Sequence, residues 1–429
     1  MAPSSHPAVF TTQTPYPLPP QMFMIPTTWS RYQLSQLVNK ALSLAKPIPF
    51  DFLLRGDLLK SSLADWCTQN AVGEEETLEI EYIESVLPPQ QMSDLPHDDW
   101  VSSVSCQLEQ RFLTASYDGQ LRTFDYSQNQ TWSSSIHGAA ITSFCIVPST
   151  LSDSHLIATA SHDLTAQLTQ VSLESAEKTK PLASLHLHTA PLSSVSSNSA
   201  GSQILTASWD GLVGLWDTLV PDVDEVPEPA AGDRKKRRKI EQVRPKRKAP
   251  LMVLKSHTAR VSGATFNDER TAYSCGFDST VRSWDLEHGV CTATITSSER
   301  PFLSLSLAPA ASAPSALLAS STDRTVSQYD FREPHSLSSL TLTHPATPSC
   351  IVRSPNHPHQ ILSGAYDGAA RIWDLRSVKG ATPVASFKAW DGEKKILGVD
   401  WKTGGIVGVA GEGGLGVWKV GEGSSTTVA

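Results

Sequence analysis

Three residues of the types that make up a hydrolytic triad lie close together in the sequence: His188, Ser208 and Asp210. In a hydrolase, such a histidine takes the proton from the serine hydroxyl, while the aspartate orients the histidine ring. The same residue types recur in several further segments of this chain, whereas an active site occurs once. We therefore interpret the set as structural and ask which elements hold it.

A six-residue signature recurs around these residues. It is found as Thr114-Ala-Ser-Tyr-Asp-Gly119, as Thr206-Ala-Ser-Trp-Asp-Gly211 and as Ser363-Gly-Ala-Tyr-Asp-Gly368. An apolar strand such as residues 203–207 precedes the Asp-Gly pair, and a second strand such as residues 212–216 follows it. Asp and Gly suit a tight turn, because Gly accepts positive φ and Asp bonds to nearby backbone donors. Each signature therefore predicts a β-hairpin.

The spacing of the turn aspartates counts the repeats. Successive intervals are 45, 47, 68, 45 and 44 residues, and a degenerate copy at Glu412 follows after 45 more. A period of about 40 to 45 residues is typical of a four-stranded propeller blade. The turn residues are Asp118, Asp163, Asp210, Asp278, Asp323 and Asp367. The prediction is a mainly β fold with a seven-bladed propeller over residues 99–429.

The repeats resemble those of WD-repeat (WD40) proteins. In that group, residues corresponding to His188, Ser208, Asp210 and Trp216 are joined by hydrogen bonds that tie the strands of a blade together. The repeats do not decide which residues form the outer strand of the last blade. Either residues 425–428 or residues ahead of the first blade could supply it.

Composition narrows the class of protein. None of the six cysteines has CxxC spacing, so we expect no zinc site, no disulfide framework and a reducing compartment. No secretory leader or membrane span is expected, since apolar runs are short. The net charge of −8 combines +9 over residues 234–248 with −17 elsewhere, so the propeller is not a globally basic nucleic-acid binder.

The one overlong interval, between Asp210 and Asp278, contains a polar insertion. Residues 219–250 combine prolines and acidic residues with a basic run, which predicts a disordered surface loop. Two basic clusters resemble a nuclear localisation signal, which an importin would bind. They comprise Arg234, Lys235, Lys236, Arg237, Arg238 and Lys239, then Lys246, Arg247 and Lys248. A merely solvated loop and a direct rRNA phosphate contact are the alternatives.

The first ninety residues follow another pattern. Strands are expected at 8–11, 21–25, 49–54 and 78–83, with an amphipathic helix over 30–42 and a helical turn at 62–66. This order predicts an α+β ubiquitin-like β-grasp domain over residues 5–90, with a linker at 91–98. Pro88 and Pro89 end it where a conjugated ubiquitin has a diglycine tail, so a docking module is expected.

Both parts together resemble one family, the WD-repeat ribosome-biogenesis factors with an N-terminal NLE (Notchless-like) domain. Four segments carry the closer resemblance to the Ytm type, a subunit of the PeBoW-type trimer that assembles the large ribosomal subunit. They are Pro49-Phe-Asp-Phe-Leu-Leu-Arg-Gly56, Leu78-Glu-Ile-Glu-Tyr82, Val86-Leu-Pro-Pro89 and Asp98-Asp-Trp-Val-Ser102.

The resemblance implies a non-enzymatic assembly factor in the nucleolus and nucleoplasm. Its propeller would dock on a Bop/Erb-type WD-repeat protein that also binds a pescadillo-type protein, on precursors of the 60S subunit. The MIDAS domain of midasin, an AAA ATPase, would then grip the ubiquitin-like domain and release the trimer. No Gly-rich phosphate loop ending in Lys-Ser/Thr occurs in this chain, so ATP chemistry would belong to midasin.

The family motif implies that Glu81 is the residue that the MIDAS domain binds. A MIDAS holds Mg²⁺ with one open coordination position, which a carboxylate from a partner can complete. Strand alternation places Leu78, Ile80 and Tyr82 on one face, and Glu79 and Glu81 on the other. No cofactor is expected beyond this Mg²⁺, which the partner would hold, so no metal site belongs to this chain alone.

Other functions remain open at this stage. Tyr329-Asp-Phe-Arg332 and Trp373-Asp-Leu-Arg376 resemble the adaptor-binding motif of substrate receptors for cullin-type ubiquitin ligases. The same arginines are also common in ordinary blades, where they form local salt bridges. A chromatin-binding platform and, less favoured, an enzyme are further alternatives. The sequence does not identify the blades that form the partner interface.

Overall fold

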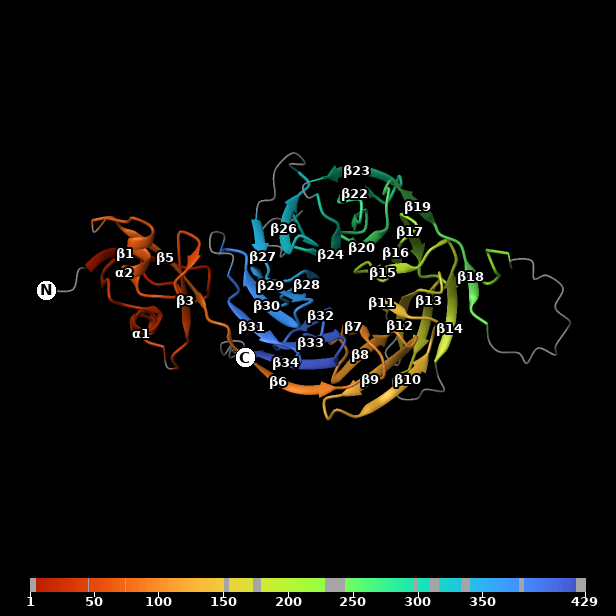
Figure 1. Ribbon diagram of the computed structural model, residues 1–429, viewed down its shortest axis with the longest axis horizontal. Helices are drawn as coiled ribbons and strands as arrows, with labels where there is room; N and C mark the ends of the chain where they lie inside the picture. Colours follow the sequence, from red (N-terminus) through yellow and green to blue (C-terminus); the bar gives the residue numbers. More distant parts are fainter. Residues whose placement is uncertain are drawn as a thin grey trace. The chain divides into compact units, whose positions relative to one another are not determined.

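The computed structural model describes residues 5–44, 46–73, 75–149, 154–172, 179–227, 244–296, 299–308, 316–332, 340–377 and 382–421. The chain forms two compact units. The first contains residues 1–90 together with 373–385 and 420–429, and the second contains residues 91–372 and 386–419. Figure 1 labels the helices and strands of both units.

The N-terminal part of the first unit is a β-grasp domain. A five-stranded sheet has the order β2-β1-β5-β3-β4, in which β1 and β5 run parallel at the centre. The strands are β1 (Ser5–Thr11), β2 (Met22–Pro26), β3 (Phe50–Leu54), β4 (Asp57–Leu58) and β5 (Leu78–Glu84), and the helices are α1 (Arg31–Leu42) and α2 (Leu63–Gln69). The predicted β-grasp fold is thereby confirmed, with α1 following β2 as expected.

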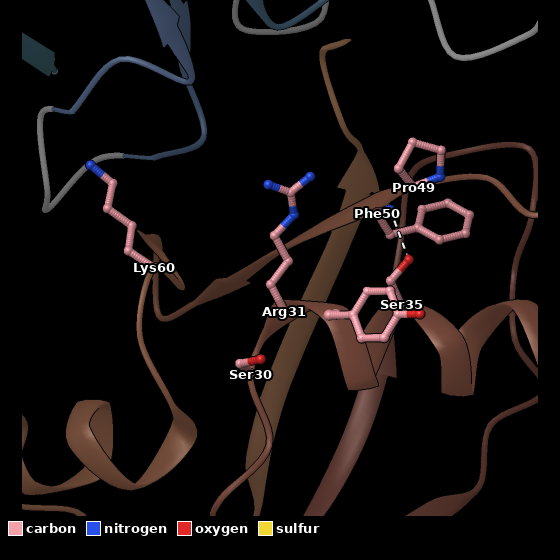
Figure 2. Close-up of a pocket in the computed structure, with 7 residues that line it drawn as sticks. Ser30, Arg31, Ser35, Pro49, Phe50 and Lys60 are labelled. Atoms are coloured by element: carbon pink, nitrogen blue, oxygen red, sulfur yellow. Dashed lines mark hydrogen bonds between the residues drawn. The ribbon is translucent and has the colours of Figure 1, made fainter. Parts of the chain in front are cut away.

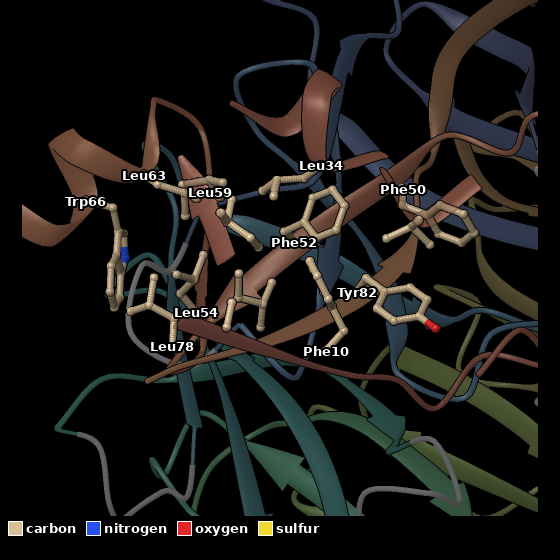
Figure 3. Packing of buried hydrophobic residues seen from close by; sticks show 14 of the residues in the cluster. Phe10, Leu34, Phe50, Phe52, Leu54, Leu59, Leu63, Trp66, Leu78 and Tyr82 are labelled. Atoms are coloured by element: carbon tan, nitrogen blue, oxygen red, sulfur yellow. The ribbon is translucent and has the colours of Figure 1, made fainter. Parts of the chain in front are cut away.

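One apolar cluster holds this domain together (Figure 3). Leu34 of α1 packs against Phe52 of β3 and Ile80 of β5, and all three are fully buried. Ser30 is the N-cap of α1, and its backbone N–H donates to the Gln33 side chain at 3.0 Å. Burial of these side chains removes apolar surface from water and fixes the helix on one face of the sheet.

The second architecture is the seven-bladed propeller, which the structure confirms as a ring of seven sheets (Figure 1). The first strand of each sheet contacts the first strand of the next, and β32 contacts β7, which closes the ring. These innermost strands are β7 (Val101–Ser105), β11 (Ile141–Val147), β15 (Leu192–Ser197), β20 (Val261–Phe266), β24 (Phe302–Leu307), β28 (Pro348–Arg353) and β32 (Ile396–Lys402).

The second and third strands of each blade flank the Asp turns. The second strands are β8 (Arg111–Ser116), β12 (His155–Ser161), β16 (Gln203–Ser208), β21 (Thr271–Gly276), β25 (Ala316–Ser321), β29 (Gln360–Ala365) and β33 (Ile406–Gly411). The third strands are β9 (Gln120–Asp125), β13 (Ala166–Val171), β17 (Leu212–Asp217), β22 (Val281–Asp285), β26 (Thr325–Asp330), β30 (Ala369–Asp374) and β34 (Gly414–Gly421). The hairpins of blades one to five and of blade seven are antiparallel, as the signatures predict, and β29 lies beside β30 in the sheet of blade six.

The outer strands complete the sheets. They are β10 (Gln130–Ser135), β14 (Lys180–Leu185), β19 (Met252–Lys255), β23 (Val290–Ile295), β27 (Leu340–Thr343), β31 (Ala385–Lys388) and β6 (Leu87–Leu95). The last of these lies beside β34, so residues ahead of the first blade close the seventh sheet.

The strand β6 corrects the predicted linker at 91–98, because residues up to Leu95 belong to a sheet. Two contacts hold it. Trp390 donates from Nε1 to Asp94 at 3.2 Å, and Gly414, at φ +104°, lies so close that a Cβ there would be 2.5 Å from the Leu95 carbonyl oxygen. The alternative strand at 425–428 lies outside the described residues.

The insertion at 219–250 also needs correction, because its described parts, 219–227 and 244–250, are ordered. Strand β18 (Lys246–Lys248) pairs in parallel with β14 and becomes a fifth strand of that blade. The backbone N–H groups of Arg247 and Ala249 donate to the carboxylates of Asp224 and Glu225, which fastens β18 to the acidic part of the insertion. The sequence-based prediction of disorder is therefore wrong for these residues.

Candidate partner-binding site

Glu81 lies on the central strand of the β-grasp sheet. It stands between Thr11 of β1, its parallel neighbour, and Leu53 of β3, its antiparallel neighbour. Leu78, Ile80 and Tyr82 point into the core, so Glu81 and Glu79 lie on the opposite face, as alternation predicts. A rigid central strand positions the carboxylate more narrowly than a loop would.

The two acids on this face have different surroundings. Glu79 is exposed, whereas the Glu81 side chain keeps 28% of its surface and accepts a bond from Arg376 Nη1 at 3.3 Å. Arg376 belongs to segment 373–385 of the same compact unit and is also held by Asp374, at 2.7 Å. Because Asp374 neutralises Arg376, the Glu81 carboxylate can change partner without leaving that guanidinium unpaired.

The edge strand beside this face is apolar and exposed. Met22 and Met24 keep 63% and 64% of their surface, and they are paired with Val9 and Pro7 of β1. Polarisable methionines adapt to the shape of a partner. Glu81 therefore lies on a sheet face that combines two acidic side chains with flexible apolar contacts.

The triad-like residues of blade three form a hydrogen-bonded chain across the blade. His188 Nδ1 lies 3.0 Å from Asp210, and His188 Nε2 lies 2.9 Å from Thr206 Oγ1, which accepts from Trp216 Nε1 at 2.9 Å. Because a carboxylate only accepts, Nδ1 carries the proton and Nε2 accepts from the threonine hydroxyl.

This chain corrects the role expected of Ser208. The hydroxyl that joins His188 to Trp216 belongs to Thr206, and Ser208 instead donates to the carbonyl oxygens of Ala190 and Pro191. Gly214, opposite Thr206, makes the contact sterically feasible, since a Cβ there would lie 2.8 Å from Trp216 Nε1. The serine is thus a turn residue and has no nucleophilic geometry toward His188.

The other turn aspartates use three kinds of partner: a histidine, an arginine or a backbone N–H. Asp163 and Asp278 bind His137 and His257, at 2.7 and 2.8 Å. Asp118 and Asp367 instead pair with the arginines four residues later, Arg122 and Arg371, while Asp323 accepts from the Thr325 backbone N–H.

Electrostatics follow from these bonds. Burial on its own would raise the pKa of Asp210, but the bonds from His188 and from the Leu212 backbone outweigh it and bring that pKa below its ordinary range. The pKa of Asp278 is lowered in the same way, against the effect of burial, by His257 and Thr280. These carboxylates are therefore charged and structural at neutral pH.

The second basic cluster is held by the fold. The Lys248 side chain is buried, and its ammonium bonds to Asp217 and to the Leu219 carbonyl oxygen. Arg247 donates to the Pro227 carbonyl oxygen at 3.1 Å, while Lys246 is exposed. Lys248 is thus unavailable to an importer groove, and the first cluster, Arg234 to Lys239, lies outside the described residues.

A pocket of about 340 Å³ opens beside α1 (Figure 2). Two of its polar side chains are already engaged: Ser35 accepts from the Phe50 backbone at 3.1 Å, and Arg31 pairs with Asp51 at 2.6 Å and donates to Ser85. Lys60 lies across from Arg31 at the opposite wall. The pocket presents no acid–base or nucleophilic pair.

The two arginines of the receptor-like motifs form local ion pairs. Arg332 binds Asp330, and Arg376 binds Asp374, each at 2.7 Å. This geometry matches the local salt bridge that is common in ordinary blades. Among the described residues, no three His, Cys, Asp or Glu side chains come together as a metal site, and no helix is long and apolar enough to cross a membrane.

The fold and these sites define the class: a WD-repeat propeller preceded by an NLE domain. Protein-family models match residues 7–67 as the NLE (NUC135) domain, and residues 179–217, 248–285 and 336–374 as WD domain, G-beta repeats. The structure adds the four blades that those repeat matches leave out.

Similar proteins narrow the class further. The chain is 61% identical to ribosome biogenesis protein YTM1 of Laccaria bicolor, over 97% of this chain and 95% of the relative. It is 55% identical to the protein of that name from Coprinopsis cinerea over the same shares, and 34% identical to that from Neosartorya fischeri over 83% and 78%. The chain belongs to the family of ribosome biogenesis protein YTM1.

Proposed function

We propose that this protein is a non-enzymatic assembly factor for the large ribosomal subunit that acts in the nucleolus and nucleoplasm. Its membership of the YTM1 family supports a role in ribosome biogenesis. The propeller docks on a Bop/Erb-type WD-repeat protein, which also binds a pescadillo-type protein, on pre-60S particles. An importin brings the protein to the nucleus, and contact of the basic insertion with rRNA is compatible with this role.

The β-grasp domain is the part of the chain that midasin binds in order to release the trimer. In this proposal Glu81 would supply a carboxylate oxygen to the open coordination position of the Mg²⁺ of a midasin-type MIDAS. The Mg²⁺ and the ATP chemistry belong to the partner. The observation that carries the proposal is the register of β5, which places Glu81 on the outer face between Thr11 and Leu53.

The chain's own contribution is positioning. The β3 and β5 ladder fixes the backbone of Glu81, and Asp374 keeps Arg376 in an ion pair when Glu81 turns to the metal. Met22 and Met24 provide apolar contacts beside the acid. Force applied to the β-grasp domain would then be transmitted to the propeller through the chain between β5 and β6.

The test is metal-dependent binding by the full-length protein. Wild type should bind a midasin-type MIDAS domain in Mg²⁺ and lose binding in EDTA, while Glu81→Gln should fail in both conditions. In cells, the same variant should trap the trimer on pre-60S particles. Equal Mg²⁺-dependent binding by wild type and Glu81→Gln would refute the role of Glu81.

A further inference from the structure

The propeller has a repeated pair of residues at one end of every blade. In six blades the residue just before the turn aspartate donates its backbone N–H to the carbonyl oxygen of the residue just before the first strand, and in the seventh blade Glu412 itself is the donor, at 2.8 to 3.0 Å throughout. We call these fourteen residues the rim. They are Trp100 and Tyr117, Ala140 and His162, Pro191 and Trp209, Arg260 and Phe277, Pro301 and Thr322, Thr347 and Tyr366, and Lys395 and Glu412.

Aromatic rings follow one another along half of the rim. Ring centroids are 6.0 Å apart for Trp100 and Tyr117, 6.3 Å for Tyr117 and His162, and 5.5 Å for His162 and Trp209. These residues come from three successive blades, and Trp100 and Trp209 keep 43% and 42% of their surface. Large exposed aromatic side chains are typical of binding surfaces.

The blade fold does not require these rings. Thr322 and Glu412 occupy the same position in blades five and seven, where they make the same backbone bond. The aromatic residues therefore need an explanation other than blade stability.

Arg260 continues the row into the fourth blade. Its guanidinium carbon lies 5.2 Å from the centroid of Trp209 and 3.3 Å from that of Phe277. Contact with two rings at once restricts this side chain through cation–π attraction. Among the described residues, no carboxylate lies within 4 Å of this arginine, whereas the other rim cation, Lys395, pairs with Glu412.

A stacked, unpaired guanidinium is suited to a carboxylate ligand. Stacking restricts the side chain before binding, which reduces the entropy lost on forming a two-pronged ion pair. Such an arginine beside exposed tryptophans has the composition of an interface hot spot. We call Trp100, Tyr117, His162, Trp209, Arg260 and Phe277 the aromatic arc.

Charge distinguishes protein from RNA as the ligand. Stacking platforms for single-stranded RNA are accompanied by a basic groove that follows the phosphates. The rim has two cationic side chains, one of them neutralised, and Asp98 and Asp99 precede Trp100, with the Asp98 side chain 95% exposed. This balance disfavours a polyanion and suits an isolated carboxylate.

We propose that the aromatic arc is the docking surface for a protein partner that presents an Asp or Glu side chain beside an apolar residue. The carboxylate pairs with Arg260, and the apolar residue packs on Trp209 and its neighbours. This assignment rests on the proposed function, in which that partner is the Bop/Erb-type propeller.

The test measures binding of the full-length protein to a Bop/Erb-type propeller by calorimetry. Arg260→Ala and Trp209→Ala should each weaken binding by about tenfold or more, the usual effect of a hot-spot truncation. The affinity of Arg260→Lys should lie between those of wild type and Arg260→Ala, because lysine keeps the charge but lacks the planar guanidinium. The matched control is Arg332→Ala, an ion-paired arginine beyond the far end of β26, which should bind like wild type.

The outcomes separate the two proposals. If wild type fails to bind that partner, the proposed function is overturned, and this inference with it. If wild type binds and the folded Arg260 and Trp209 variants bind equally well, the arc assignment alone is overturned. Capture of a single-stranded RNA oligonucleotide by wild type, lost in Arg260→Ala while partner binding is kept, would also overturn it in favour of RNA.

Discussion

Glu81 lies directly opposite Leu53 in the antiparallel ladder of β3 and β5. The pairing fixes a charged side chain on the outer face of a sheet whose inner face is buried by Leu34 and its neighbours. A one-residue slip would turn Glu81 into the core and Ile80 outward, at a large cost in burial. The outward position of Glu81 is therefore specified by the same hydrophobic pattern that specifies the fold of the domain.

The hydrogen-bonded chain in blade three predicts a stability effect. Thr206→Val keeps the shape but leaves His188 Nε2 and Trp216 Nε1 without their buried partner. We expect a loss of about 2 to 4 kcal/mol in the free energy of unfolding, measured by urea titration.

The matched control is Thr159→Val in blade two. Thr159 binds His137 at 2.8 Å, and no tryptophan occupies the position that corresponds to Trp216. Only one buried partner is lost, so about half the effect is expected. Equal losses in the two variants would argue against a shared role for Thr206.

The first basic cluster of the insertion and Lys248 should have different functions, one in nuclear import and the other in stability. Replacing Arg234, Lys235, Lys236, Arg237, Arg238 and Lys239 with alanine should abolish nuclear accumulation of a fluorescent fusion and leave the melting temperature unchanged. Lys248→Met should lower the melting temperature and leave nuclear accumulation unchanged, because it removes the ion-pair partner of Asp217 but no accessible lysine. Nuclear exclusion of Lys248→Met, with unchanged stability, would contradict this division.

Much of the architecture could be predicted because its signals are local. The Asp-Gly turns at a fixed period specify hairpins, and the periodicity of residues 30–42 specifies a helix. Strand β6 was not decided by local signals, since two segments had a suitable offset. The contacts of Asp94 with Trp390 and of Leu95 with Gly414, which are far apart in the sequence, hold β6 in the sheet.

The roles of the misassigned residues depended on tertiary contacts that no linear motif shows. Thr206 and Ser208 share one face of β16, and only the room left by Gly214 lets Trp216 reach the threonine. Lys248 looks solvated in a run of charges, yet Asp217 and Leu219, about thirty residues earlier, bury it. The aromatic arc is likewise spread over four blades and has no linear motif.

His344 makes stability depend on pH. It is 2% exposed, and burial, together with the charge of Arg371 and against that of Asp367, lowers its pKa to about 4. Between pH 6.5 and 4 the unfolded chain binds a proton that the folded chain does not. Stability from this group therefore falls as the pH drops, by about 2 kcal/mol at pH 5. Urea titrations at pH 7 and 5 should give a smaller loss for His344→Phe than for wild type. An unchanged difference would show that other groups govern the acid sensitivity.

The role of Glu81 is tested most directly by calorimetric titration of the full-length protein with a midasin-type MIDAS domain in Mg²⁺. We predict that Glu81→Gln weakens binding by about thirty- to a hundred-and-fifty-fold, since a lost charged contact is worth about 2 to 3 kcal/mol. The control is Glu79→Gln, at an exposed position, which should bind the MIDAS domain like wild type. It should also bind the Bop/Erb-type propeller as tightly as wild type does. Mg²⁺-dependent binding by Glu81→Gln at wild-type affinity would contradict the account.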